Sequence, residues 1–443
     1  MRPHSDSDVD DVEMEDFAEE DESEDYIQDE AIMPASLRPP AHGQTEDPWG
    51  GFVLLDLTAY MADRRNATTA TCKMRDGKGV IHVTFCTAGP PLVSYFCVHC
   101  TGGLKLSELA LEPEIIATEG SLVLLRVALG EVMNSMEPDI SEYFIYRAGA
   151  EGPSLTQLPH PGPIVLPQHP HVAIVRYCRK PRHDCSHCNY TIASLYRGAD
   201  GPPESFYLCL YRSDTMTWSR ETIPDKEVPN SCLFTSKTIT IGGKRGTVGW
   251  VDLLQGIVFC DVLADTRQHT LHYVPIPSLL AEREDLSCPA ADIAVVNGFI
   301  SYIEMKVRVV PGSCSRYGAY TSDGWVAVKW TMKITDSLSD PWHLDCQLDS
   351  SEISDALPKL LVDADTPQPT LQTLHIGQPT LSLLENGVVY FLAKIDHRDQ
   401  DRKAWVLAVD METNKIQGVD EFGAERTLGL GPTFIASRVS AYL

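Results

Sequence analysis

The clearest structural signal in this chain is Val248–Leu280, which reads VGWVDLLQGIVFCDVLADTRQHTLHYVPIPSLL. An extended apolar run, VGWVDLLQGIVFCDVL, leads into a polar turn, ADTRQHT, and a second strand-like run, LHYVPIP, follows. Short strands divided by turn residues are typical of all-β folds. The stretch holds no catalytic group at a fixed spacing, so it indicates an architecture and leaves the function open.

The same pattern recurs along the chain. Four segments share it: 205–224, 256–277, 404–422 and, more loosely, 142–159. Each has an apolar strand, a polar turn and an outgoing strand. We expect Asp214, Asp265 and Asp410 at the turns, because an Asp side chain accepts hydrogen bonds from the backbone that follows it. Trp218 and Tyr273 occupy similar places in the outgoing strands.

These segments predict a mostly β fold, a β-propeller-like array of short antiparallel strands. Repeat units of roughly 45 to 50 residues match the period of propeller blades. Residues 49–443 then leave room for about six to eight blades. A closed propeller also leaves few sheet edges open to aggregation. Helices are expected to be few and short, at Leu104–Leu111 and Glu352–Leu361.

The first 48 residues differ in composition from the rest. Residues 1–32 contain fifteen Asp and Glu and one Arg, a charge of −14 out of −26 for the whole chain. Such a block cannot bury enough apolar surface to fold, so we expect a disordered tail. The Pro-rich stretch Met33–Pro48 is predicted to be a linker. A single propeller-like domain is expected over residues 49–443.

Composition also limits the classes of partner and compartment. Hydrophobic residues make up 43% of the chain and charged residues 22%, as in soluble globular proteins. Nucleic acid is not an expected partner, because no basic footprint is visible. No apolar run approaches the roughly 18 residues of a membrane helix, and no signal peptide is visible, so a cytoplasmic or nuclear location is expected. The thirteen cysteines are expected to be reduced thiols.

Two CxxC motifs are the candidates for metal chemistry. Cys97 and Cys100 lie in a strand-like run, LVSYFCVHC, where they would point to opposite faces and could not share a metal. Redox chemistry of the thioredoxin kind would require a βαβ context, which is missing around both motifs.

The second motif lies in a polar, basic loop, RKPRHDCSHCNY. There Cys178, Cys185 and Cys188, with His183 or His187, could bind one zinc ion, because thiolates and imidazoles at such spacing form structural zinc sites. The alternative is a loop with free cysteines.

Enzyme signatures are missing from the sequence: it has no GxSxG, HExxH, P-loop or strand-following GxGxxG motif. Asp252 and Asp261 could do acid–base work, but turn and strand-end Asp residues that bond the backbone are far commoner. No catalytic or cofactor-binding residue is therefore predicted. Because a fold alone never excludes a site on its loops, an enzyme with a site in the propeller channel stays an alternative.

Four blocks carry a family resemblance: VLLDLTAYMADRRNATTA, PPLVSYFCVHC, GWVDLLQGIVFCDVL with its LHYVPIP sequel, and PTFIASRVSAYL. They resemble the plant family named domain of unknown function 1618, over nearly everything from Trp49 to Leu443. The resemblance implies a plant protein and brings no activity, cofactor or site residue with it. The chain is also distantly similar to F-box-associated and kelch-like propeller domains, although no F-box-like motif precedes Trp49.

The sequence favours a protein-interaction scaffold that uses the loop surfaces of a propeller-like domain. Its partner would be another protein of unknown identity, and no membrane contact is expected. Arg64, Arg65 and the loop 179–189 are the expected basic contacts. An uncharacterised enzyme and a zinc-stabilised structural module are the alternatives.

Overall fold

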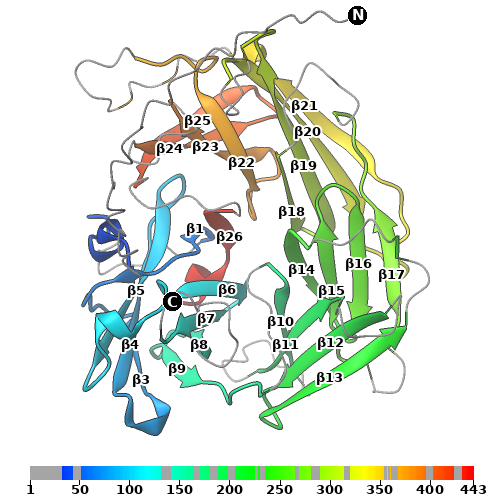
Figure 1. Ribbon diagram of the computed structural model, residues 1–443. Coiled ribbons are helices and arrows are strands. Elements are labelled where there is room, and N and C mark those ends of the chain that lie inside the picture. The colour runs from blue at the N-terminus through cyan, green and yellow to red at the C-terminus, as the bar shows by residue number, and fades with distance from the viewer. Residues whose placement is uncertain are drawn as a thin grey trace, which may run out of the picture. The chain divides into compact units, whose positions relative to one another are not determined.

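A computed structural model shows the architecture of most of the chain. It describes residues 32–42, 51–130, 141–162, 170–178, 188–197, 205–224, 228–229, 235–264, 269–280, 290–313, 320–353, 357, 360, 368–395, 403–423 and 432–443. Residues Ala31–Leu443 form one compact unit. Within the described residues the strands form six sheets, arranged as a six-bladed β-propeller (Figure 1).

The six blades follow one another along the chain. Blade 1 contains β1 (Val53–Asp56), β2 (Tyr60–Met61), β3 (Ala70–Lys73), β4 (Val80–Cys86), β5 (Val93–Thr101) and β26 (Phe434–Ser437). Blade 2 contains β6 (Glu114–Glu119), β7 (Leu122–Ala128), β8 (Ser141–Arg147) and β9 (Ser154–Gln157). Blade 3 contains β10 (Val172–Tyr177), β11 (Asn189–Tyr196), β12 (Ser205–Arg212) and β13 (Thr217–Pro224).

The second half of the propeller repeats this four-strand plan. Blade 4 contains β14 (Lys237–Gly242), β15 (Thr247–Asp252), β16 (Gly256–Asp261) and β17 (Leu271–Pro275). Blade 5 contains β18 (Ala290–Val296), β19 (Phe299–Val309), β20 (Ser322–Lys333) and β21 (His343–Asp349). Blade 6 contains β22 (His375–Leu381), β23 (Val388–Lys394), β24 (Ala404–Asp410) and β25 (Lys415–Phe422). The first strand of each of blades 2 to 6 lies nearest the centre (Figure 1).

Burial along the strands explains why apolar residues occupy both faces. Every residue of β7 and of β23 is buried, because middle strands are covered by a neighbouring blade on each side. The outermost strands behave differently: β13 and β17 mix buried with exposed positions. The continuous apolar pattern of VGWVD is therefore that of a middle strand of a blade, with all of β15 buried.

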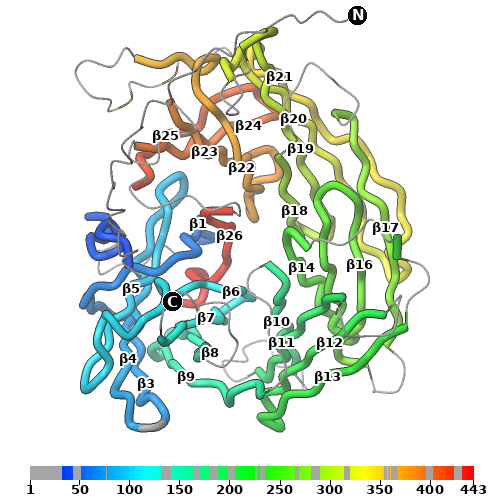
Figure 2. The backbone as a smooth tube through the Cα atoms, in the orientation of Figure 1, coloured from blue at the N-terminus to red at the C-terminus, as the bar shows by residue number. Residues whose placement is uncertain are grey.

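The two ends of the described chain meet in blade 1. The last strand, β26, pairs antiparallel with β1, with Val53 opposite Ser437 and Asp56 opposite Phe434. Figure 2 shows the red end of the tube beside the blue strands of this blade. Six blades are the lower end of the expected range of six to eight; blade 1 contains six strands and the other blades four.

The repeat read from the sequence corresponds to the outer hairpins of four blades. Its copies are β8–β9, β12–β13, β16–β17 and β24–β25. Asp214 lies in the turn after β12, and Asp410 accepts hydrogen bonds from the backbone N–H groups of Glu412 and Thr413. Asp265 lies outside the described residues. The apolar run Val248–Leu263 contains two strands, because a tight turn at residues 253–255 separates β15 from β16.

The helix prediction for Leu104–Leu111 is wrong, and the one for Glu352–Leu361 stays a prediction, because most of that range lies outside the described residues. Leu104–Leu111 contains only the 3-10 turn η3 (Leu106–Glu108), and near Glu352–Leu361 the turn is η6 (Ser350–Glu352). The other helical turns among the described residues are η1 (Pro34–Leu37), η2 (Arg75–Gly77) and η7 (Val439–Tyr442). Among the described residues no helix is long and apolar enough to cross a membrane.

Part of the expected linker packs on the propeller. Ile32 is buried in the core shared by blades 1 and 2, and Ser36 and the Met33 backbone both donate hydrogen bonds to the Glu112 carboxylate. Residues 33–42 therefore form a strap against the propeller, and Gly43 to Pro48 lie outside the described residues.

Gly249 in β15 offers a direct test of blade packing. A Cβ atom there would lie 2.8 Å from side-chain atoms of Ile257 and Phe259, so Gly249→Ala overfills the sheet interface. We expect it to lower the free energy of unfolding by about 1 to 3 kcal/mol in denaturant titrations. The matched control is Gly377→Ala in β22, where a Cβ meets nothing within 4 Å. Equal stability of the two variants would contradict the packing described here.

Candidate functional site

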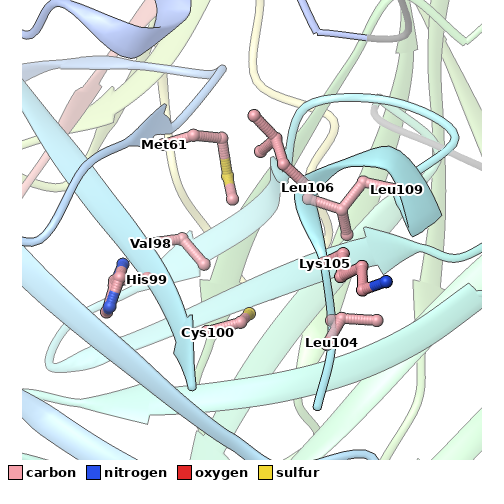
Figure 3. A pocket seen from close by; sticks show the side chains of 8 residues that line it. All are labelled: Met61, Val98, His99, Cys100, Leu104, Lys105, Leu106 and Leu109. Atoms are coloured by element: carbon pink, nitrogen blue, oxygen red, sulfur yellow. The ribbon is translucent and has the colours of Figure 1, made fainter. Parts of the chain in front are cut away.

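A small pocket lies in blade 1, at the end of β5. It has a volume of about 250 Å³ and is lined by Met61, Val98, His99, Cys100, Leu104, Lys105, Leu106 and Leu109 (Figure 3). Most of these side chains are apolar, and they come from three separate segments: β2, β5 and the connection that contains η3.

Local backbone geometry builds the walls of the pocket. β2 runs parallel to β5 and places Met61 opposite Val98. Gly102 and Gly103 adopt positive φ angles, which lets the chain reverse after β5 and return along the pocket. Glu108 accepts a hydrogen bond from the Lys105 backbone and closes the η3 turn. Leu109 is buried, whereas Leu106 keeps 41% of its surface exposed at the rim.

The chemistry of the pocket suits binding better than catalysis. Burial raises the pKa of the Cys100 thiol to about 11, so at neutral pH it is a protonated, apolar group. His99 points away from Cys100 (Figure 3), stacks on His82 and lies 3.9 Å from the Asp63 carboxylate. Thiol and imidazole therefore do not form a nucleophile–base pair. Lys105 supplies the positive charge at the edge.

Cys97, the other half of the first CxxC motif, faces a different cluster. It is buried with Tyr60, Cys86 and Tyr95, on the side of the sheet away from the pocket. A hydrogen bond with Cys97, supported by Tyr95 and Arg64, lowers the pKa of Cys86 to about 7, although burial opposes the shift. Because side chains alternate between the two faces of a strand, Cys97 and Cys100 lie on opposite sides of the sheet, as expected.

The second motif contains a disulfide. Cys178 and Cys188 are joined, with their Cα atoms 5.2 Å apart, where β10 ends and β11 begins. The expectation that all thirteen cysteines are reduced is therefore wrong for this pair. Seven of the described cysteines are in no disulfide: Cys72, Cys86, Cys97, Cys100, Cys209, Cys260 and Cys346.

The zinc hypothesis for this motif stays a prediction. Cys185, His183 and His187 lie outside the described residues. The described residues alone contain no group of three or more potential metal ligands. A sulfur in a disulfide cannot serve as a thiolate ligand, so zinc binding would require the reduced form of Cys178 and Cys188.

The structure assigns different roles to the expected basic contacts. Arg64 holds the strap, because its guanidinium donates to the carbonyl oxygens of Pro39 and Pro40 and to the Tyr95 hydroxyl. Arg65 is half exposed and pairs with Asp63. The tip of the loop 179–189 lies outside the described residues.

The two strand-end carboxylates of blade 4 serve local structure. Asp252 accepts from the Leu254 backbone N–H, and Asp261 accepts from the Thr247 hydroxyl.

Sequence reasoning missed the pocket. The sequence pattern that could have indicated it is Gly102-Gly103 followed by spaced apolar residues. The same pattern also suits the start of a helix. The contribution of Met61 had no local signal, because it reaches the pocket only through the pairing of β2 with β5.

The disulfide can be checked by peptide mapping. Protein alkylated in denaturant without reductant should yield one cross-linked pair of peptides containing Cys178 and Cys188, and reductant should abolish it. Cys178→Ser should free Cys188 for alkylation. Alkylation of both cysteines without reductant would contradict the pairing.

Metal analysis of the reduced protein tests the zinc hypothesis. One equivalent of bound zinc in the wild-type protein, and none in Cys185→Ser, would support it.

The raised pKa of Cys100 predicts slow alkylation. At pH 8 its reaction with iodoacetamide should be about 100-fold slower than that of an unburied thiol, because the thiolate is the nucleophile. The rate should rise about tenfold per pH unit until the pH reaches about 11. Mass spectrometry of the Cys100 peptide measures it, and a rate that levels off below pH 9 would contradict the burial of the thiol.

Two solved structures show a weak similarity to this chain. One solved structure, "High resolution structure of Penicillium chrysogenum alpha-L-arabinanase complexed with arabinobiose", matches at 14% identity and TM-score 0.25, over 71% of this chain and 94% of that one. A xylan beta-1,4-xylosidase from Bacillus Halodurans C-125 matches at 9% identity and TM-score 0.29, over 80% of this chain and 70% of that one. Scores this low support no argument about function.

No curated protein matches the chain. Residues 250–390 match the family described as "Protein of unknown function (DUF1618)". The matched region runs from β15 in blade 4 to β23 in blade 6, so it is shorter than the resemblance seen in the sequence. Residues 250–390 of the six-bladed propeller are thus similar to this family of unknown function.

Proposed function

We propose that this protein is a protein-interaction scaffold whose blade 1 pocket holds one apolar side chain of a partner protein. The observation that carries the proposal is the lining of the pocket: Met61, Val98, Leu104, Leu106 and Leu109 surround a protonated thiol. An apolar side chain that enters such a cavity is stabilised because it leaves water, and the cavity offers no reactive group for covalent chemistry.

The size of the pocket supports a single anchoring residue. Burial of a Leu, Met or Phe side chain contributes about 1.5 to 3 kcal/mol, which is the scale of an interface hot spot. Leu106, with 41% of its surface exposed, extends the apolar area around the opening. Lys105 favours a partner that has an Asp or Glu beside its buried apolar side chain. Opposite charges at the rim of an interface speed association and fix the orientation of the partner.

The enzyme alternative lacks an acid–base pair within the pocket. His99 points away from Cys100, and the thiol is protonated at neutral pH. A site in the channel stays a prediction, and so does the zinc-stabilised module. Arg65 and the loop 179–189 remain the proposed flanking contacts of a partner.

Selection from a displayed random-peptide library tests the proposal. We expect enriched peptides with one large apolar residue next to an acidic one. Leu106→Asp should weaken their binding at least about tenfold, because it adds a charge to the apolar rim. The matched control is Leu254→Asp in the turn between β15 and β16, where Leu254 is 64% exposed.

Two results would reject the pocket as the binding site. One is a selection that enriches no such peptide. The other is equal weakening by Leu106→Asp and Leu254→Asp, which would show that the peptides do not use blade 1. Proximity labelling in native cells with the same two variants then identifies the partner that depends on Leu106.

A further inference from the structure

The second half of the strap, residues 38–42, lies on the face of blade 1 that is turned away from the pocket. Its sequence is RPPAH, and it lies beside β5 (Figure 1). Two side chains of blade 1 hold it: Arg64, which follows β2, and Tyr95 of β5. Tyr95 lies three residues before Val98 of the pocket, so the two side chains are on opposite faces of the strand. This contact is therefore separate from the pocket.

The two side chains bind the backbone of this segment. The Arg64 guanidinium donates hydrogen bonds of 2.7 Å to the Pro40 carbonyl oxygen and of 3.1 Å to that of Pro39. The Tyr95 hydroxyl oxygen lies 2.9 Å from the Pro40 carbonyl oxygen and 2.7 Å from that of His42, so its proton can bond either acceptor. Arg64 also donates to the Tyr95 hydroxyl oxygen, which links the two side chains. Three backbone carbonyl oxygens of the segment thus face one arginine–tyrosine pair.

Aromatic rings line the contact. The rings of Tyr60 and Tyr95 lie 5.1 Å apart, edge to face, because the parallel pairing of β2 with β5 brings both to one face. The His42 ring packs edge-on against Tyr95 at 5.7 Å, and its Nε2 donates to the Val93 carbonyl oxygen. Both tyrosines are buried. Grooves lined by aromatic rings are the usual docking sites of proline-rich peptides.

An extended proline segment suits this site for a physical reason. Proline has no N–H and holds φ at about −65°, so consecutive prolines favour the extended polyproline II conformation, whose carbonyl oxygens have no internal partner. Those oxygens are available to a guanidinium and a phenol. Little conformational entropy is lost on binding, because the segment is already extended. The site therefore makes few demands on the other side chains of a ligand.

We propose that Arg64 and Tyr95 form a binding site for a proline-rich segment of a partner protein, and that residues 38–42 occupy it in the partner's absence. The carbonyl oxygens of the partner's prolines take the places of those of Pro39 and Pro40. The strap then acts as an intramolecular competitor, because its attachment to the propeller keeps its effective concentration high.

The two halves of the strap are held differently, which allows this exchange. The first half is anchored: Ser36 is buried, and its hydroxyl and the Met33 backbone both donate to Glu112. None of residues 38–42 is buried. The second half can therefore leave its site without exposing a buried apolar side chain of its own, while the first half remains docked. A strap that binds less well should leave the site open to the partner more of the time.

Fluorescence anisotropy of the full chain with a labelled peptide, LRPPAHG, tests the proposal. The peptide has the sequence of residues 37–43. A double variant, Pro39→Ala with Pro40→Ala, has a weakened strap and should bind the peptide at least about tenfold more tightly than the wild type. A control peptide in which alanine replaces both prolines should bind the double variant at least about tenfold more weakly than LRPPAHG.

Tyr95→Phe, introduced into the double variant, should weaken peptide binding about tenfold, because the peptide carbonyl oxygens lose the hydroxyl donor. The matched control is Tyr302→Phe in blade 5, because Tyr302 is also buried and its hydroxyl donates to the Leu253 carbonyl oxygen. Arg64→Lys is a second variant of the site. It keeps the charge but loses the guanidinium fork, and it should weaken binding to a similar degree. Thermal unfolding shows which of these variants are folded.

Four results would overturn the proposal. The first is absence of saturable binding to the double variant, and the second is equal binding of the alanine peptide. The third is equal peptide binding by Tyr302→Phe and by the folded variants Tyr95→Phe and Arg64→Lys. The fourth is weaker binding in Leu106→Asp, which would place the peptide in the pocket. A wild-type dimer that dissociates in the double variant would also count against it, because the occupant would then be the strap of a second copy.

Discussion

The pairing of β26 with β1 is the constraint on which the rest of the structure depends. It places the first and last strands of the propeller in one sheet, so that blade 1 closes the ring between blades 2 and 6. Phe434 of β26 packs among Phe52, Leu54 and Val93 of blade 1 and Val388 and Tyr390 of blade 6. Without this closure both neighbouring blades would expose an apolar face to water, and burial of such faces is the main source of stability in a propeller.

The parts of the fold that follow from local pattern could be predicted. Strands such as β15 and β23 are short apolar runs bounded by turn residues, and the hairpin repeat needs only an Asp at a turn, as at Asp214 and Asp410. Leu104–Leu111 shows where local pattern misleads. Its spacing suits a helix, but Gly102 and Gly103 reverse the chain, and Leu104 and Leu109 line the pocket. Tertiary packing overrode the local preference.

The candidate sites were harder to predict, because their residues come from distant segments. Met61 lies opposite Val98 because β2 pairs parallel with β5, and no local sequence pattern predicts that pairing. Cys178 and Cys188 form a disulfide because β10 and β11 are antiparallel neighbours, with Tyr177 opposite Asn189. Arg64 looked like a surface contact, yet the strap at Pro39 and Pro40 engages it. Each of these outcomes depends on which strands are adjacent, and closure of the ring sets that adjacency.

Native-state amide hydrogen exchange of a Phe434→Ala variant tests the central claim, that closure in blade 1 supports the whole propeller. Phe434 is 2% exposed, so its truncation should cost about 3 to 5 kcal/mol. The account predicts similar losses of protection in β5, which lines the pocket, and in β23 of blade 6. Loss of protection confined to β26 and β1, with β5 and β23 unchanged, would contradict it.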